Sequence, residues 1–324
     1  MKHTIITAIL ACLGGLYACT KSIPPEEVDV VPLYDIVASL SSADEAATQA
    51  AIDSFGSELS ALVAVVSGEP MNADVVQAWA NSQAVAVFTP LVDSLYQGRS
   101  CADALGHILA NAKHEGLALP RRQYAEVVYG RPESMVFVDT VMLVALNHYL
   151  GADFDGYSHL PDYMRRVKTP QMLPYDLAEA LVATSYPCRE TPDATVASRL
   201  IYEGALAMAR MRLVPDADEA TALGYTPEQY KQLKANEKTL WQTLIQRQLL
   251  FDTAESTAQR LVAPSPATTD LGSNVPGRAG RFIGYRMICS YLAQPDADTT
   301  SLAILLSPAF YAAPTALQTI RYNP

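Results

Sequence analysis

The feature that most constrains the fold is a single block rich in Val, Tyr and Phe, set among segments with helical periodicity. The block covers residues 123–130 and 134–147, which we expect to form strands separated by a turn at Gly130-Arg131-Pro132. Helical patterns occupy the flanks, at about 42–66, 82–96, 101–113, 172–186, 195–212, 226–250, 279–292 and 299–306. One short strand block among many helices predicts an α+β fold, mostly helical, with a small sheet.

Two helix starts can be located from capping residues. Ser42, followed three residues later by Glu45, predicts a capping box before an Ala-rich helix that runs to about Val66. Thr226, with Pro227 at the first helical position and Gln229 at the third, predicts a second one.

The N-terminal segment "MKHTIITAILACLGGLYACTKS" has the layout of an export signal, with a basic residue at Lys2 and an apolar run over 5–16. Residues 16–19, "LYAC", fit a bacterial lipobox, in which Cys19 receives the lipid. We therefore expect a lipoprotein signal peptide over 1–18 and acyl chains such as palmitate on Cys19. The Pro-containing, charged segment 19–32 is expected to be a lipidated tether.

No other apolar run approaches the roughly 20 residues needed to span a bilayer, so attachment to the membrane is expected through the lipid anchor alone. The body, residues 33–324, is expected to form one domain, with an N-terminal part over 33–130 and a second part over 131–324. Glu26-Glu27, after the lipidated cysteine, bear weakly on whether the protein faces the periplasm or the cell surface, and the sequence leaves this orientation open.

Composition excludes two classes of protein. Half of the residues are hydrophobic, which argues against intrinsic disorder of the bulk, and the formal net charge is −11. An acidic chain is unsuited to nucleic acid, and the short basic pairs Arg121-Arg122 and Arg165-Arg166 are expected to decorate the surface. Cys101, Cys188 and Cys289 form no recognisable disulfide framework, and their pairing stays open.

The segment "YDLAEALVATSYP", residues 175–187, carries the most specific pattern for chemistry. Glu179 lies in it, and Glu203-Gly204 follows 24 residues later, as in zinc peptidases that use an HExxH helix and a Glu on a later helix. The two histidine positions hold Ala178 and Val182 instead. Two carboxylates without nitrogen donors make a poor zinc site, so neither a metal nor another cofactor is expected. From the residues alone, a solvated Glu on each of two helices is the commoner explanation.

Three segments carry a family resemblance: "DTVMLVALNHYLGADFDGYSHLPDYMRRVKTPQMLPYDLAEALV" (139–182), "RLIYEGALAMA" (199–209) and "PGRAGRFIGYRMICSYL" (276–292). Together they resemble the gliding-motility lipoprotein B family of Bacteroidota, distant relatives of putative HExxH zinc peptidases. The resemblance implies a zincin-like, peptidase-like fold whose metal-binding histidines are absent, in a lipoprotein of the outer membrane. The part over 131–324 would then be a degenerate zincin-like part.

The resemblance also assigns site positions. Glu179 occupies the catalytic position, Glu203 the third-ligand position, and Ala178 and Val182 the histidine positions, while Arg281 and Tyr285 would line a binding cleft with the two glutamates. The implied function is that of a pseudoenzyme that binds an envelope protein or peptide, in gliding motility or its associated secretion machinery. The alternative is a metal-dependent hydrolase with an atypical site around Glu179 and Glu203, whose metal is recruited by other groups such as His148 or His159.

Three further patterns bear on possible sites. His107 and His114 lie two helical turns apart, too far for one metal without other ligands. Gly277, Gly280 and Gly284 permit close helix packing, which we favour, although Arg278 and Arg281 beside them could also hold an anion. The aromatic residues of the loop before 172 suit either an interaction surface or the closing of the core; they are Phe154, Tyr157 and Tyr163.

Overall fold

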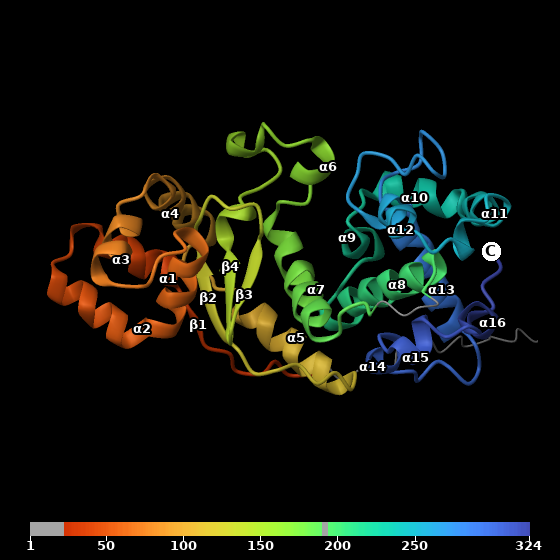
Figure 1. Ribbon diagram of the computed structural model, residues 1–324, viewed down its shortest axis with the longest axis horizontal. Helices are drawn as coiled ribbons and strands as arrows, with labels where there is room; N and C mark the ends of the chain where they lie inside the picture. Colours follow the sequence, from red (N-terminus) through yellow and green to blue (C-terminus); the bar gives the residue numbers. More distant parts are fainter. Residues whose placement is uncertain (1–22, 190–193) are drawn as a thin grey trace, which may run out of the picture.

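The computed structural model describes residues 23–189 and 194–324, and apart from one short strand before the first helix its elements follow the order predicted from sequence: helices, a small sheet, then helices again (Figure 1). The first group of helices is α1 (Leu33–Ser39), α2 (Glu45–Val66), α3 (Ala73–Ala80), α4 (Gln83–Tyr96) and α5 (Ala102–His114). The strands are β1 (Val30–Val31), β2 (Gln123–Val127), β3 (Met135–Val138) and β4 (Val141–Ala145). The second group is α6 (Asp162–Arg165), α7 (Leu173–Ser185), α8 (Val196–Leu213), α9 (Glu219–Leu223), α10 (Pro227–Ala235), α11 (Glu237–Gln246), α12 (Glu255–Val262), α13 (Ala279–Leu292), α14 (Leu302–Leu305), α15 (Pro308–Tyr311) and α16 (Ala316–Ile320). The α+β class is confirmed.

The strand block forms a mixed sheet in the order β1-β2-β4-β3. β2 pairs in parallel with β4, and β3 pairs antiparallel with β4. The segment predicted as one extended run over 134–147 is therefore a hairpin, which turns at Asp139, where φ is 49°. All five residues of β4 are buried, as expected for a central strand covered on both faces.

The segment expected to be a tether through residue 32 attaches to the body earlier than predicted. Val30 and Val31 form β1, which pairs in parallel with Tyr124 and Ala125, and the amide of Glu26 donates to the Gly106 carbonyl at 3.1 Å. The two valines, interpreted as part of a polar linker, supply an edge strand. The predicted signal peptide over 1–18 and the lipidation site Cys19 lie outside the described residues. No helix in the described ranges is both long and apolar enough to cross a bilayer.

The two predicted caps have different outcomes. Thr226 and Gln229 form the predicted capping box at the start of α10. The prediction for Ser42 and Glu45 is wrong, because Ser42 lies in a 3-10 turn and the carboxylate of Asp44 accepts the Ala47 amide at 2.8 Å instead. Asp44 and Ser42 are both good cap residues, so sequence alone could not place the helix start to the residue.

Other helix boundaries also changed. The helix predicted over 226–250 is interrupted at Asn236, which ends α10 and precedes α11. The one predicted over 299–306 shortens to α14, and sequence patterns missed several short helices: α1, α3, α6, α9, α12, α15 and α16.

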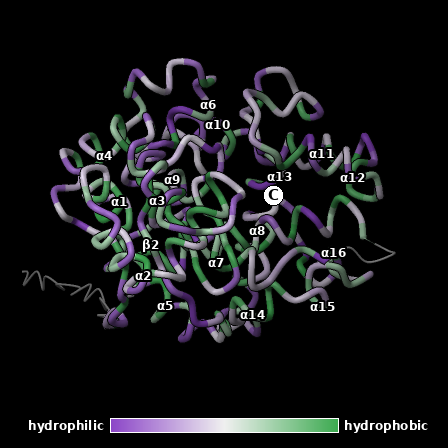
Figure 2. Tube along the Cα trace, turned by 60° about the vertical axis from the view of Figure 1, so that its left-hand side comes forward, coloured by the Kyte–Doolittle hydropathy of each residue, from purple (hydrophilic) through white to green (hydrophobic). Residues whose placement is uncertain are grey.

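The centre of the second half is the crossing of α8 and α13, and α7 packs against α8 beside it. A Cβ built on Gly204 would lie 2.1 Å from the carbonyl carbon of Gly284, and one on Gly284 would lie 1.8 Å from the Leu200 oxygen. Close packing, the favoured explanation for the glycines, is thus confirmed for Gly284, and Gly204 of the Glu-Gly pair has the same role. Figure 2 shows hydrophobic residues along α7, α8 and β2 in the interior, and hydrophilic residues on the outer turns.

Candidate functional site

The two positions that would hold zinc-binding histidines are part of the core. Ala178 and Val182 lie one turn apart on α7, and neither side chain is exposed to solvent. Their packing role, expected from two apolar residues on one face, is confirmed. These positions offer only hydrocarbon, so they present no donor atom to a metal.

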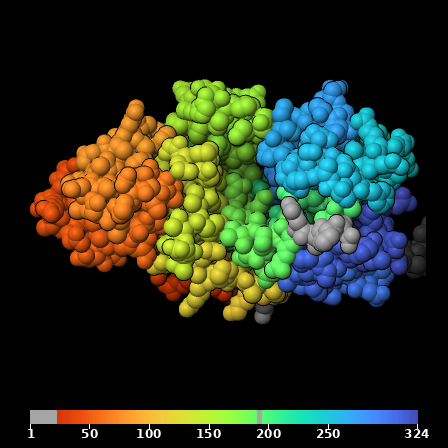
Figure 3. Space-filling model, in the orientation of Figure 1, coloured from red at the N-terminus to blue at the C-terminus, as the bar shows by residue number. Residues whose placement is uncertain are grey.

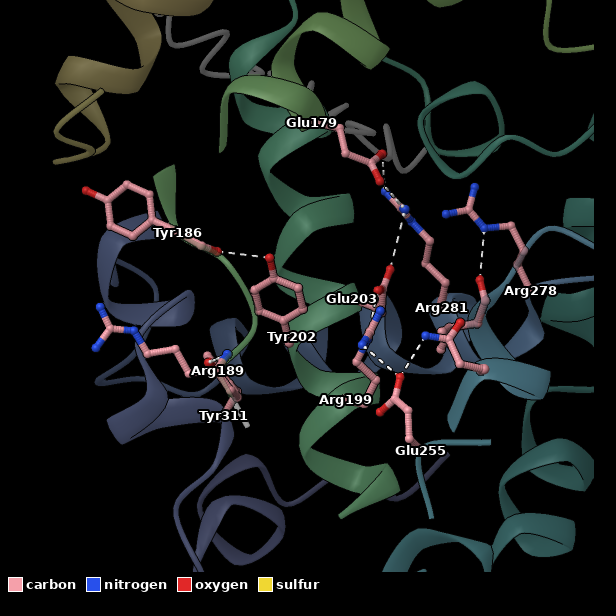
Figure 4. Close-up of polar contacts among 12 residues, drawn as sticks. Glu179, Tyr186, Arg189, Arg199, Tyr202, Glu203, Glu255, Arg278, Arg281 and Tyr311 are labelled. Carbon is pink, nitrogen blue, oxygen red and sulfur yellow. Dashed lines mark hydrogen bonds and ion pairs between the residues drawn. The ribbon is translucent and has the colours of Figure 1, made fainter. Parts of the chain in front are cut away.

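Glu179 lies on the neighbouring face of α7 and binds two arginines, Arg281, which Figure 4 shows, and Arg210. Arg281 of α13 donates to both oxygens, from Nη1 to Oε1 at 2.7 Å and from Nη2 to Oε2 at 2.7 Å. Arg210 of α8 donates from Nη1 to Oε2 at 2.6 Å. Burial by itself would raise the pKa of Glu179, but Arg281 and Arg210 hold this pKa well below its usual 4.5. A carboxylate that is both occupied by three donors and weakly basic is a poor proton acceptor.

Glu203 joins the same network through Arg281, whose guanidinium lies between the two glutamates (Figure 4). Arg281 Nη1 is 3.6 Å from Glu203 Oε2, and Arg199 Nε donates to Glu203 Oε1 at 3.0 Å. Glu203 is 6% exposed and Arg281 is 0% exposed. The explanation of two solvated glutamates is therefore wrong, since the pair of glutamates is brought together as counter-ions for a buried arginine.

Asp176 extends the network on the other side. Its Oδ1 is 3.3 Å from Arg210 Nη2, and its Oδ2 accepts the Tyr149 hydroxyl at 2.9 Å. Burial raises the pKa of Asp176, although Arg210 opposes this shift. Sequence reasoning missed Arg210, although a charged residue inside the apolar run "ALAMARMRL" was a visible signal for a buried ion pair.

The two residues expected to line a cleft with the glutamates have different positions. Arg281 contacts both glutamates, but it does so from inside the core. Tyr285, 3% exposed, donates its hydroxyl to Glu219 at 2.9 Å and makes no hydrogen bond to Glu179 or Glu203. The two side chains lie on the same side of α13 but one turn apart along its axis, and at that level Tyr285 meets Glu219 of α9.

An open pocket lies beside this network and was not predicted. Asp176 and Arg210 form one wall, Arg278 another, and the loop that carries α6 contributes Arg166 and Lys168. In Figure 3 the molecule is hollowed between the yellow-green block around α6 and the blue block to its right. Arg166 was expected to decorate the surface, but it is half-buried in this pocket.

The loop aromatics divide between the two explanations given above. Tyr157 is buried, and its hydroxyl donates to the Asn147 carbonyl at 2.6 Å. The ring of Phe154 is half-buried and packs edge-on against Tyr157 with centroids 5.0 Å apart, so these two rings pack within the loop itself. Tyr163 instead lines the pocket.

The histidines and cysteines form no metal centre within the described ranges. His148 is 7% exposed, its Nδ1 is 3.0 Å from the Ser134 hydroxyl, and burial lowers its pKa to about 4. His159 is exposed on the loop. Cys101, Cys188 and Cys289 are unpaired with one another.

The sequence model of the family described as "Gliding motility protein GldB" matches residues 27–311. The chain belongs to this GldB family. Its members are lipoproteins associated with gliding motility, so the chain is a membrane-anchored lipoprotein of the cell envelope. No curated protein matches the chain, and no solved structure matches it. The family is thus the one predicted from the three sequence segments, while the relation to HExxH peptidases stays a prediction.

Proposed function

We propose that this GldB-family lipoprotein is a non-catalytic envelope protein that binds a protein or peptide partner, in gliding motility or the secretion machinery associated with it. The observation that carries the proposal is the occupation of both Glu179 oxygens by Arg281 and Arg210 at 2.6–2.7 Å. Glu179 is the one acidic group at the position where the resemblance would put a catalytic base. The lone pairs of Glu179 already accept hydrogen bonds from the two arginines, which supports a function of the protein in binding rather than in proton transfer.

The alternative, a metal-dependent hydrolase around Glu179 and Glu203, needs two things that the local geometry opposes. Glu179 would have to leave a bidentate pair with Arg281, and this would leave a fully buried guanidinium without its best partner. A metal would also have to approach Glu203, whose oxygens already contact Arg199 and Arg281. A cation placed beside these arginines would be repelled.

A complementation experiment tests the non-catalytic function. The paired variant Glu179→Gln/Arg281→Met removes the base and the guanidinium that depends on it, so that no unpaired charge is left between them. We expect this variant to restore gliding to a strain lacking the gene when it is present at wild-type abundance. If the variant is folded and abundant but inactive, while the wild-type protein holds stoichiometric zinc by elemental analysis, the proposal is wrong and the hydrolase function is favoured.

The binding partner is tested separately. The lipoprotein, purified from native envelopes after cross-linking in intact cells, should retain a specific protein at a constant ratio. The paired variant should retain the same protein, because its change is internal to the network. If no protein is recovered cross-linked to the wild-type lipoprotein, the proposed role in binding is contradicted.

A further inference from the structure

The pocket beside the ion network concentrates positive charge in a strongly acidic protein. Its volume is about 180 Å³, and four cationic side chains line it: Arg166, Lys168, Arg210 and Arg278. The whole chain carries 34 acidic residues and 23 Lys and Arg, so a gathering of cations with one carboxylate is contrary to its overall charge. These cations come from three separate parts of the chain, the α6 loop, α8 and the residue before α13.

Three of the four cations have no counter-ion. Arg210 is paired with Asp176 and Glu179, but Arg166, Lys168 and Arg278 have no carboxylate within 4.0 Å among the described residues. Asp176, the one carboxylate in the lining, is already used by Arg210 and by the Tyr149 hydroxyl. The pocket therefore has an excess of three positive charges at its wall.

The donors of these cations are incompletely used. Arg278 donates from Nε to the Val262 carbonyl at 3.1 Å, and Arg166 donates from Nη2 to the Gly224 carbonyl at 3.3 Å. The Lys168 ammonium lies 5.6 Å above the Tyr157 ring. Buried Nε groups of Arg166 and Arg210 have no acceptor, and Arg210 is only 3% exposed. Burial lowers the pKa of Arg166, Lys168 and Arg278, which agrees with cations that lack a partner.

Clustered guanidinium groups with unused donors fit a multiply charged oxyanion better than a single carboxylate. Arginine binds phosphate through several charge-assisted hydrogen bonds, and a phosphate monoester carries about two negative charges at neutral pH. The volume admits a phosphate with a small organic group, and the remaining wall offers Val167, Met172 and Tyr225 to an apolar part. We propose that this pocket binds the phosphate group of a small phosphate monoester, held by Arg166, Lys168 and Arg278.

The phosphate could belong to a soluble metabolite or to a lipid headgroup, and calorimetry on the detergent-purified lipoprotein separates the two. The probes are inorganic phosphate, glycerol 3-phosphate and dibutyryl phosphatidic acid, with succinate and chloride for comparison. We expect saturable binding of glycerol 3-phosphate or of the short lipid, and the tighter of the two identifies the source. Binding of neither, or binding of succinate as tight as that of the phosphate probes, would overturn the proposal.

Variants show whether binding takes place in this pocket. Lys168→Gln and Arg166→Gln should each weaken binding about tenfold or more, because each removes a charged donor. Lys238→Gln removes an exposed ammonium on α11 and should leave the affinity unchanged. Thermal unfolding without ligand distinguishes a site from a fold defect, since Lys168→Gln relieves repulsion and should not lower Tm. Unchanged affinity in both pocket variants would refute the assignment.

Discussion

Replacement of Glu179 by Gln tests whether this carboxylate stabilises the fold or performs chemistry. Glu179 accepts three hydrogen bonds of 2.6–2.7 Å from Arg281 and Arg210, which are 0% and 3% exposed. Removal of one partner from a buried pair costs about 3–5 kcal/mol, because a charge is left without compensation. Arg281 keeps Glu203 at 3.6 Å and Arg210 keeps Asp176 at 3.3 Å, so we expect the lower end, about 3 kcal/mol.

Urea unfolding followed by Trp fluorescence measures this loss as a lower midpoint with an unchanged slope. The second substitution, Arg281→Met, supplies the control. It should recover much of the stability lost in Glu179→Gln, because the pair is then removed together, and the coupling energy of the double-mutant cycle should be at least about 2 kcal/mol. A catalytic carboxylate with no structural role predicts the reverse, a Gln variant as stable as the wild type and a cycle with no coupling. That result would refute the reasoning.

The effect of Glu179→Gln should also depend on pH in a defined direction. The pKa of Glu179 is depressed in the folded state from its usual 4.5. Its stabilising contribution is therefore complete above the pKa of the unfolded chain and is lost as pH falls further toward the folded value. The difference between wild type and variant should thus be constant near neutral pH and shrink below about pH 4.5.

Three further predictions concern other parts of the molecule. Gly204→Ala should destabilise the protein by about 1–3 kcal/mol or more in urea unfolding, because its Cβ would meet the backbone of Gly284. Gly56→Ala, whose Cβ would have nothing within 4 Å, should be neutral or slightly stabilising, and equal effects of the two variants would contradict the tight helix crossing. Burial lowers the pKa of His148 from 6.5 to about 4, so as pH falls this residue binds a proton in the unfolded chain before it does in the folded one, and the free energy of unfolding should fall by up to about 3 kcal/mol between pH 6.5 and 4. His148→Gln should remove that part of the fall, and parallel pH profiles of stability for wild type and variant would count against this prediction. Cys101, buried and with its pKa raised by burial, should resist maleimide until the protein unfolds, as mass spectrometry of pulse-labelled protein would show; rapid labelling of native protein would be inconsistent with its burial.

The class of fold and the long helices could be predicted because their signals are local. The Val-rich block predicted the sheet, and Thr226 with Gln229 predicted the start of α10. What could not be predicted depends on pairing across the chain. Val30 and Val31 become a strand only because β2 lies beside them, and two residues carry no periodicity of their own.

The association of Glu179 with Glu203 could be predicted from the sequence, but the arginines that they bind could not. The spacing of Glu179 and Glu203 placed both on facing helices, and the structure brings them to one arginine. Arg281 was expected at a cleft wall, since a sequence does not reveal whether an arginine is exposed or matched by buried carboxylates. The pocket shared by Arg278 and Arg166 could not be predicted either, because it depends on how the loop that carries α6 folds beside α7.

A buried guanidinium gives Glu179 a structural role that requires no histidines beside it. Arg281 is fully buried at the point where α13 crosses α8, and a charge there is tolerable only with a paired carboxylate. Changing Ala178 or Val182 to His would therefore not create a zinc site, because these side chains point into the core and Glu179 stays bound to two arginines. A change at Glu179, in contrast, disturbs three helices at once, α7, α8 and α13. Selection for stability alone is then sufficient to keep an acidic residue at this position, which makes the presence of Glu179 weak evidence for catalysis.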